Sequence, residues 1–325
     1  MHLKALWLNG QLVDHTSPHL KINDHGLVVG DGVFETLLAV TDLNSLSSDT
    51  SSSSEASLPE LKNQTTEDNE ATAAATEAIV SFKGRRTAFA VRRHLDRLRR
   101  SASVLDIDCP YSDLELHEAI DACLAAAPDS SVVRITVTSG LGPLGSPRGD
   151  EKSTVMVMVG GDQFDYQPGT TVAVMPFPRN ERGVLTNVKS LSYAENVIAL
   201  KMAKERGASE AIFGDTRGYL SEGTGSNIFW VEDGMLCTPP LDTGCLAGIT
   251  RGLVMELLDV TEKHLKLDAL PLVSEAFLTS TLRIVQSISS VISGDNVVTL
   301  PTIDGILTCA ASTALTKLLA SNINP

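Results

Sequence analysis

Several features are scarce in this chain of 325 residues, and each absence excludes a class of protein. Aromatic residues make up 4% of the sequence, and its five cysteines are widely scattered without a Cys-x-x-Cys pair. An odd number of scattered cysteines is typical of reduced cytoplasmic thiols, not of a disulfide framework or a zinc site. The sequence also lacks His-Glu-x-x-His, so we expect no metal. With no apolar run near the ~18 residues of a membrane span and no signal-peptide pattern, we expect a cytoplasmic protein without a membrane partner.

Basic residues are also fewer than acidic ones. Lys and Arg number 26 against 40 Asp and Glu, which gives a net charge of −14. A protein that binds nucleic acid through bulk charge needs the opposite balance, so we expect no nucleic-acid partner. Eight basic residues do fall within residues 83–100. In so acidic a chain that cluster indicates a solvated helix face.

Residues 41–81 have the composition of a disordered insertion. The segment contains no glycine and no aromatic residue, and its eight acids and one base give it a net charge of −7. Low hydrophobicity combined with net charge does not compensate the entropy lost on ordering. We therefore expect a solvated surface insertion without a direct functional role.

Hydrophobic patterning divides the rest of the chain into two halves of mixed strands and helices. Two strand-like segments flank the insertion and predict a hairpin with the insertion at its tip. A helix with apolar residues at spacings of three and four follows at 95–105. We expect an α/β, or mixed α+β, fold of two domains: a smaller one over residues 1–160 and a larger one over 161–325.

Four local features have the chemistry to hold an anionic cofactor, although each is weak alone. Residues 246–250 open a predicted helix that Thr250 is placed to cap, and free amides at a helix start attract anions. Residues 279–281 (Thr-Ser-Thr) offer hydroxyls at a strand end. Arg97 lies on an amphipathic helix, where it is ordinarily solvated. Lys189 lies between a strand and a helix, where partial burial of its amine would lower its pKa and favour Schiff-base chemistry.

Together and in this order, these features resemble the fold-type IV pyridoxal-phosphate enzymes. That family comprises branched-chain aminotransferases, D-amino-acid aminotransferases and 4-amino-4-deoxychorismate lyases, and the resemblance covers the chain outside residues 41–81. It implies a two-domain fold like that of D-amino-acid aminotransferase, with pyridoxal 5'-phosphate as cofactor. Seven blocks of sequence carry it: Gly30–Thr36, Arg93–Leu98, Val188–Asn196, Leu220–Phe229, Thr238–Asp242, Leu246–Arg251 and Leu278–Leu282.

The resemblance assigns roles to particular residues. Lys189 matches the lysine that binds the cofactor covalently and then transfers the proton. Glu222 matches the acid that hydrogen-bonds the pyridine nitrogen. Tyr193 lies one residue before the position where some relatives have a tyrosine for the cofactor's phenolic oxygen; that position is Ala194 here. The phosphate is expected to bind Arg97, the Ile249 and Thr250 amides, Ser280 and Thr281.

Two reactions stay open within the family. Residues 137–148, 239–251 and 279–282 look most like lyases, which convert 4-amino-4-deoxychorismate to 4-aminobenzoate and pyruvate in folate biosynthesis. The tyrosine of D-amino-acid aminotransferases is replaced by Phe34, and their arginine is missing near Ser139. We therefore favour the lyase, with a branched-chain or other amino-acid transaminase as the alternative.

The remaining expectations concern the substrate and the assembly. The lyase substrate is a small molecule with two carboxylates, so Arg148 and Arg134 are candidates for binding it, alongside Phe34. Both arginines also have an ordinary structural interpretation, one in a loop and the other on a strand. Members of the family are typically homodimers, and the resemblance implies one here.

Overall fold

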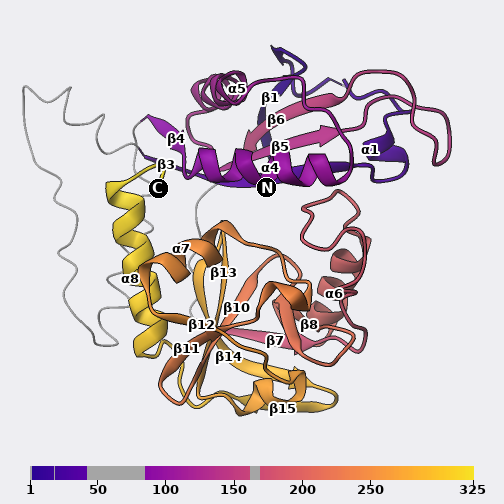
Figure 1. Ribbon diagram of the computed structural model, residues 1–325. Coiled ribbons are helices and arrows are strands. Elements are labelled where there is room, and N and C mark those ends of the chain that lie inside the picture. Colours follow the sequence, from indigo (N-terminus) through magenta and orange to yellow (C-terminus); the bar gives the residue numbers. More distant parts are fainter. Residues whose placement is uncertain (1, 18, 42–84, 162–168) are drawn as a thin grey trace, which may run out of the picture.

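Two β-sheets, one from each half of the chain, form the framework of the protein (Figure 1). The computed structural model describes residues 2–17, 19–41, 85–161 and 169–325. Nearly all of the predicted insertion at 41–81 therefore lies outside the described residues. The first sheet ends with β6 at Gly160, and the second begins with β7 at Thr170. The predicted domain bounds, 1–160 and 161–325, coincide with this change of sheet and otherwise stay a prediction.

The first sheet has six strands in the order β2-β1-β6-β5-β3-β4, and every neighbouring pair is antiparallel. The pairing of β3 with β4 confirms the predicted hairpin across the insertion. Strand β3 is almost wholly buried along its ten residues, because both of its faces are covered. The strands are β1 (Leu3–Leu8), β2 (Gln11–Val13), β3 (Gly32–Thr41), β4 (Arg86–Ala88), β5 (Val132–Thr138) and β6 (Thr154–Gly160).

Helices α4 (Val91–Val104) and α5 (Asp113–Ala126) pack against this sheet, and the short α1 (His25–Val28) precedes β3. The predicted apolar face of α4 is buried through Leu95, Leu98 and Ala102. Helix α5 begins with a capping box between Ser112 and Glu115, which satisfies amide groups at its start. One face of α4 thus packs in the core, and Arg97 on the same helix is buried as well.

The second sheet is mixed and has nine strands, in the order β12-β11-β10-β13-β14-β7-β8-β9 with β15 beside β14. The pairs β14–β7, β7–β8 and β11–β12 are parallel. The strands are β7 (Thr170–Val174), β8 (Glu210–Gly214), β9 (Leu220–Gly223), β10 (Asn227–Glu232), β11 (Met235–Thr238), β12 (Val260–Glu262), β13 (Glu275–Ser280), β14 (Ile284–Ser293) and β15 (Asn296–Thr299).

Helices α6 (Ala194–Glu205) and α8 (Ile306–Ser321) lie on opposite flanks of the second sheet, with α7 (Ile249–Leu257) near α8 (Figure 1). Two short 3₁₀ segments, Leu241–Thr243 and Leu267–Leu272, complete this half. The prediction that Thr250 caps α7 is wrong. The helix begins at Ile249, and extended Gly248 is its N-cap, so Thr250 lies inside the first turn.

Main-chain bonds join the two halves beside Lys189. The Phe34 amide in β3 donates to the Lys189 carbonyl at 2.9 Å, and the Leu191 amide donates to Gly32 at 2.8 Å. A mixed apolar cluster adds to the junction, with Phe89 packing among residues of α7, α8 and the second sheet. The segment around Lys189 is thus clamped against the first sheet.

No helix within the described ranges is long and apolar enough to cross a membrane. All five cysteines are free thiols.

Candidate active site

A cavity of about 750 Å³ opens between the two halves and gathers most of the predicted site residues. Its size falls within the ~300–1,000 Å³ typical of small-molecule sites. The lining combines side chains from α4, the segment before α6, β9, the start of α7 and the end of β13. The predicted residues among them are Arg97, Lys189, Tyr193, Glu222, Ile249, Thr250, Ser280 and Thr281.

Lys189 lies in the loop before α6, and its backbone is held on two sides. Its amide donates to Ser101 Oγ on α4 at 3.2 Å, and its carbonyl accepts the Phe34 bond. Burial lowers the Lys189 pKa to about 8, and the positive charge of Arg97 acts in the same direction. Glu35 and Glu222 oppose this shift. About a tenth of the amine is therefore unprotonated at pH 7, far more than for an ordinary lysine, and able to act as a nucleophile.

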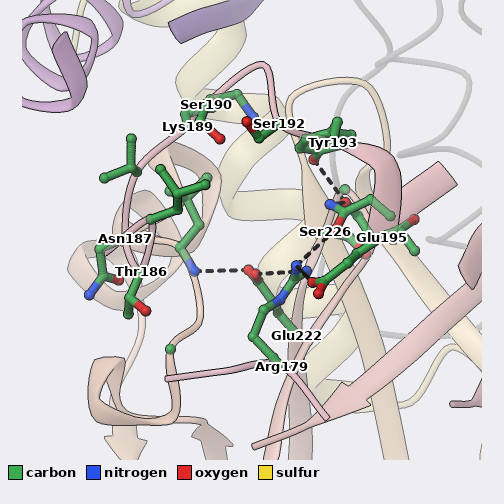
Figure 2. A pocket seen from close by; sticks show the side chains of 18 of the residues that line it. Arg179, Thr186, Asn187, Lys189, Ser190, Ser192, Tyr193, Glu195, Glu222 and Ser226 are labelled. Atoms are coloured by element: carbon green, nitrogen blue, oxygen red, sulfur yellow. Dashed lines mark hydrogen bonds and ion pairs between the residues drawn. The ribbon is translucent and has the colours of Figure 1, made fainter. Parts of the chain in front are cut away.

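Glu222 in β9 faces the same cavity with few partners. One carboxylate oxygen accepts the Leu246 amide at 2.8 Å, and the other lies 3.3 Å from Arg179 Nη2. Burial raises the pKa of Glu222, and Arg179 partly offsets that effect. Figure 2 shows Arg179 and Glu222 side by side in the cavity wall. An acid in this setting is able to hold or share a proton with a buried ligand.

Arg179 is a cavity residue that the sequence did not indicate. Its guanidinium lies 4.2 Å from the centre of the Phe213 ring and donates to Asn196 Oδ1 at 2.8 Å. It follows β7 in a loop with no recognisable motif, so no local signal distinguishes it from a surface arginine. Asn196 belongs to a block that carries the family resemblance, but nothing in that block reveals its contact with Arg179.

Tyr193 lies immediately before α6 with its ring edge against Phe34, the ring centres 5.5 Å apart. Its hydroxyl donates to the Thr224 carbonyl at 2.8 Å. Burial raises the pKa of the phenol, and the nearby Glu222 contributes in the same direction. The hydroxyl is thus protonated at neutral pH and belongs to the same wall as Glu222.

The start of α7 forms an anion-binding end of the cavity. The Ile249 and Thr250 positions line it, and among the described residues no side chain caps the helix. A side chain at Gly248 would bring its Cβ within 1.9 Å of Asn227 Oδ1, so the turn requires glycine. Nearby Thr279 Oγ1 is buried and has no hydrogen-bond partner in the described part of the chain. Free amides and an unpartnered hydroxyl suit a phosphate group.

Arg97 reaches this end from α4 and is already paired. It makes two bonds of 2.7 Å to the Glu35 carboxylate and one of 3.0 Å to the Ala247 carbonyl. His94 Nδ1 lies 2.7 Å from the same carboxylate. Burial alone would raise the Glu35 pKa, but Arg97 and His94 outweigh it and hold the pKa at about 2. Arg97 therefore presents its guanidinium edge from a fixed orientation.

Phe34 and Arg134 lie just behind the lysine. Neither Phe34 nor Arg134 lines the cavity. Lys189 Nζ lies 4.5 Å from the centre of the Phe34 ring, and the Arg134 guanidinium lies 3.8 Å from it. Within the described ranges Arg134 has no carboxylate partner, and burial lowers its pKa. A partly buried guanidinium without an acid is a ready receptor for a carboxylate.

Arg148 lies in the loop after β5, away from the cavity lining. It makes two bonds of 2.7 Å to the Asp31 carboxylate and also donates to the Leu105 and Asp106 carbonyls. These bonds hold the loop after β5 against the end of α4, and the contact of Arg148 with a substrate carboxylate stays a prediction.

In the described part of the chain, no group of three or more His, Cys, Asp or Glu side chains is arranged to hold a metal ion.

Comparison with known proteins gives one consistent family. The model of amino-transferase class IV matches residues 75–291. A Methanocaldococcus jannaschii protein, provisionally named a branched-chain-amino-acid aminotransferase, is 31% identical over 288 residues, or 85% of this chain and 84% of its own length.

Solved structures share the fold. The branched-chain amino acid aminotransferase from Escherichia coli superposes with a TM-score of 0.77 at 24% identity, covering 98% of this chain and 95% of its own. The branched-chain aminotransferase from the archaeon Thermoproteus uzoniensis, solved with norvaline, has a TM-score of 0.74 at 23% identity, covering 99% and 97%. A further branched-chain amino acid aminotransferase, solved with pyridoxamine 5'-phosphate, has a TM-score of 0.78 at 21% identity, covering 100% and 97%. At these identities the likeness establishes the fold alone.

Proposed function

The chain belongs to the class IV aminotransferases, and from that premise we propose that it is a pyridoxal-phosphate-dependent aminotransferase acting at Lys189. The observation that carries the proposal is a part-buried lysine, with a pKa of about 8, in a cavity that is also lined by a largely buried acid and by a helix start without a side-chain cap. Pyridoxal phosphate is the cofactor of this family.

The residues of the cavity fit that cofactor. Its phosphate suits the Ile249 and Thr250 amides, the unpartnered Thr279 hydroxyl beside Ser280 and Thr281, and the edge of Arg97. Its pyridine nitrogen suits the Glu222 carboxylate, which has an open, weakly paired oxygen. When bound, the cofactor supplies an electron sink for the α-carbon of an amino acid.

The protein's own groups divide the work around that carbon. Lys189 Nζ would hold the cofactor covalently and, when released from it, would remove and return the α-proton. Glu222 keeps a proton on the ring nitrogen, and Arg179 keeps Glu222 oriented. Tyr193 lines the cavity beside the lysine, and the Phe34 ring packs against it from behind.

Arg134 points to the chemistry of the substrates. Arg134 lies against Phe34, outside the cavity lining, and has no carboxylate partner among the described residues, so it would suit an amino acid or keto acid whose second carboxylate extends beyond that lining. The apolar lining from Val29, Leu191 and Leu246 suits an aliphatic side chain. We therefore propose exchange of an amino group between an aliphatic amino acid and an acidic keto acid. The relatives named branched-chain aminotransferases support this choice over the lyase.

The lyase remains a second candidate on one specific ground. Residues 239–251 and 279–282 look most like lyases, and Arg134 would equally suit the second carboxylate of 4-amino-4-deoxychorismate. The two reactions differ in one requirement, because only transamination consumes a keto acid.

The deciding experiment uses that requirement. Purified, cofactor-loaded protein is given leucine, isoleucine, valine or glutamate with 2-oxoglutarate or a branched-chain keto acid, and product amino acids are measured. We expect turnover only when a keto acid is present. Formation of 4-aminobenzoate and pyruvate from 4-amino-4-deoxychorismate without a keto acid, and no transamination, would establish the lyase instead. Arg134→Met should raise KM for the acidic substrate about 10- to 100-fold and leave KM for leucine nearly unchanged.

We also propose that the enzyme is a homodimer, as the family resemblance implies. Exposed apolar side chains near the cavity mouth support self-association, notably Leu27 (60% exposed), Val184 (77%) and Val197 (61%). Analytical ultracentrifugation should give twice the chain mass at micromolar concentration; a monomer at all concentrations would contradict this proposal.

A further inference from the structure

A third buried glutamate, Glu210, lies behind the wall of the cavity. It begins β8 and is 2% exposed. One carboxylate oxygen accepts the Ala211 amide at 3.1 Å together with the amide and hydroxyl of Thr224. The other accepts Ser226 Oγ at 3.1 Å and Arg283 Nη2 at 3.2 Å. Five donors, four of them from outside β8, thus converge on one buried carboxylate and tie it to the turn after β9 and to Arg283.

We propose that Glu210 is a positioning residue for the cofactor, which holds the turn from Gly223 to Ser226 so that Glu222 and Tyr193 keep their places in the cavity. The inference rests on the cofactor assignment above, but not on the choice between transamination and lysis. Glu210 does not itself line the cavity and acts through the turn.

The turn connects Glu210 to both groups. Glu222 lies two residues before Thr224 in the chain, at the end of β9. The Thr224 carbonyl accepts the Tyr193 hydroxyl at 2.8 Å and Asn196 Nδ2 at 2.6 Å. Asn196 in turn accepts from Arg179, which contacts Glu222. Together with the chain from Glu222 to Thr224, these contacts form a closed ring that includes Glu222. Glu210 holds the main-chain part of that ring in place through its bonds to Thr224 and Ser226.

The packing leaves the turn little freedom to move independently. A Cβ at Gly223 would lie 2.3 Å from Ser226 Oγ and 3.2 Å from the Glu210 carboxyl carbon. The carboxylate therefore sits directly against the backbone between Glu222 and Thr224. Because close-packed groups transmit displacement, a shift of the Glu210 side chain moves the turn and the acid together.

Glu210 also contributes its charge. It is one of the groups that raise the pKa of Glu222, after burial and against Arg179 and Lys189, and it raises the pKa of Tyr193 as well. Arg283 is its only cationic partner among the described residues. Neutralising Glu210 removes a negative charge and leaves Arg283 unopposed, so both changes favour the deprotonated form of nearby groups.

The test compares Glu210→Gln with Glu275→Gln. Glu275 is a matched control: it is 6% exposed and accepts the amide and hydroxyl of Thr308 at 2.6 and 2.5 Å, in the same half of the protein but off the cavity lining. Apoprotein is titrated with pyridoxal phosphate, and the dissociation constant is measured from visible absorbance. The pH at which the absorbance of the loaded protein changes is recorded for each variant.

For Glu210→Gln we expect a dissociation constant about 10- to 100-fold higher, the range seen when supporting groups around a bound centre are lost. We also expect the spectral midpoint to fall by roughly half a pH unit or more, as for a charge acting through an effective dielectric of about 20. For Glu275→Gln the dissociation constant and the spectral midpoint should equal those of the wild type, even if its melting temperature falls as much as that of Glu210→Gln.

If Glu210→Gln and Glu275→Gln shift the dissociation constant and the spectral midpoint equally, or if neither variant shifts them, the positioning role of Glu210 is overturned. If Glu210→Gln does not fold, Ser226→Ala removes one of the five donors, and a dissociation constant raised about fivefold is expected, as for one lost hydrogen bond; an unchanged constant overturns the inference. Failure of the wild type to gain a Lys189-dependent absorbance would instead refute the cofactor assignment, which separates the two failures.

Discussion

Two glutamates near Lys189, one on each sheet, are fully or largely buried (0% exposed for Glu35 and 12% for Glu222), yet they are held in different ways. Glu35, on the first sheet, receives two short bonds from Arg97 and one contact from His94, and its pKa is held at about 2. Glu222, on the second sheet, has one amide at 2.8 Å and one guanidinium at 3.3 Å, and burial raises its pKa. The two carboxylates differ little in burial, but they differ in the number and geometry of their cationic donors.

The difference separates a structural role from a chemical one. A carboxylate that is saturated by donors stays charged and orients its partner, as Glu35 orients Arg97. A carboxylate with a spare oxygen is able to accept a hydrogen bond from a bound ligand, which is what a protonated ring nitrogen of the cofactor would require of Glu222. Lys189 lies within the field of both, since each of them raises its pKa against the effect of burial.

Removing the lysine should have the largest effect. Lys189→Ala deletes the amine that both glutamates act upon, so turnover should fall at least about a thousandfold and the visible absorbance of the bound cofactor should be lost. Lys201→Ala is the matched control, because Lys201 is 70% exposed and pairs with Glu205 on α6, away from the cavity. Full activity in Lys189→Ala would refute the proposed function.

The next largest effect should come from Glu35→Gln, and it should appear in stability. The change leaves Arg97 buried beside a neutral group, so the free energy of unfolding should fall by about 3–5 kcal/mol in denaturant melts at pH 7. Because the Glu35 pKa is lowered, its contribution is present above the unfolded pKa of ~4.3 and is lost as pH falls towards about 2. The difference in the free energy of unfolding between wild type and Glu35→Gln should therefore shrink as the pH falls through that range. A difference that does not change with pH would contradict the pairing of Glu35 with Arg97.

Glu222→Gln should show the reverse pattern. The amide retains the shape of the side chain but cannot keep a proton on the ring nitrogen, so kcat should fall about 100-fold or more. The free energy of unfolding should stay within about 1 kcal/mol of the wild type, because a single 3.3 Å contact is lost. If the kcat of Glu222→Gln equals that of the wild type, or if its loss of stability is as large as that of Glu35→Gln, the assignment of a chemical role to Glu222 and a structural role to Glu35 is contradicted.

The smallest effect is expected for Arg148→Ala. Arg148 pairs with Asp31 away from the cavity lining and is 36% exposed in its side chain, so its loss should cost about 1 kcal/mol or less. Turnover and KM should stay within about twofold of the wild type. A large rise in KM for the acidic substrate would return Arg148 to the role that the sequence suggested.

Local sequence was sufficient for most elements and for the main site residues. The apolar spacing after residue 90 predicted α4, the strand pattern predicted the β3–β4 hairpin, and seven ordered blocks led to Lys189 and Glu222. These features are encoded within a few residues of each other, by periodicity or by motif. Without the motif, Glu222 would have passed for a solvent-facing turn acid.

The amino-acid sequence by itself determined the family, the order of the elements and many of the residues that line the cavity. Tertiary structure decided which charged side chains pair. Arg148 pairs with Asp31, 117 residues away in the chain, and Arg97 pairs with Glu35, 62 residues away. Arg179 contacts Glu222, and no sequence motif indicates this pair. It also moved the start of α7 from Thr250 to Gly248, where Asn227 leaves no room for a side chain. The physical reason is that burial and pairing depend on groups distant in the chain, so the charge state of a carboxylate is a property of the folded protein.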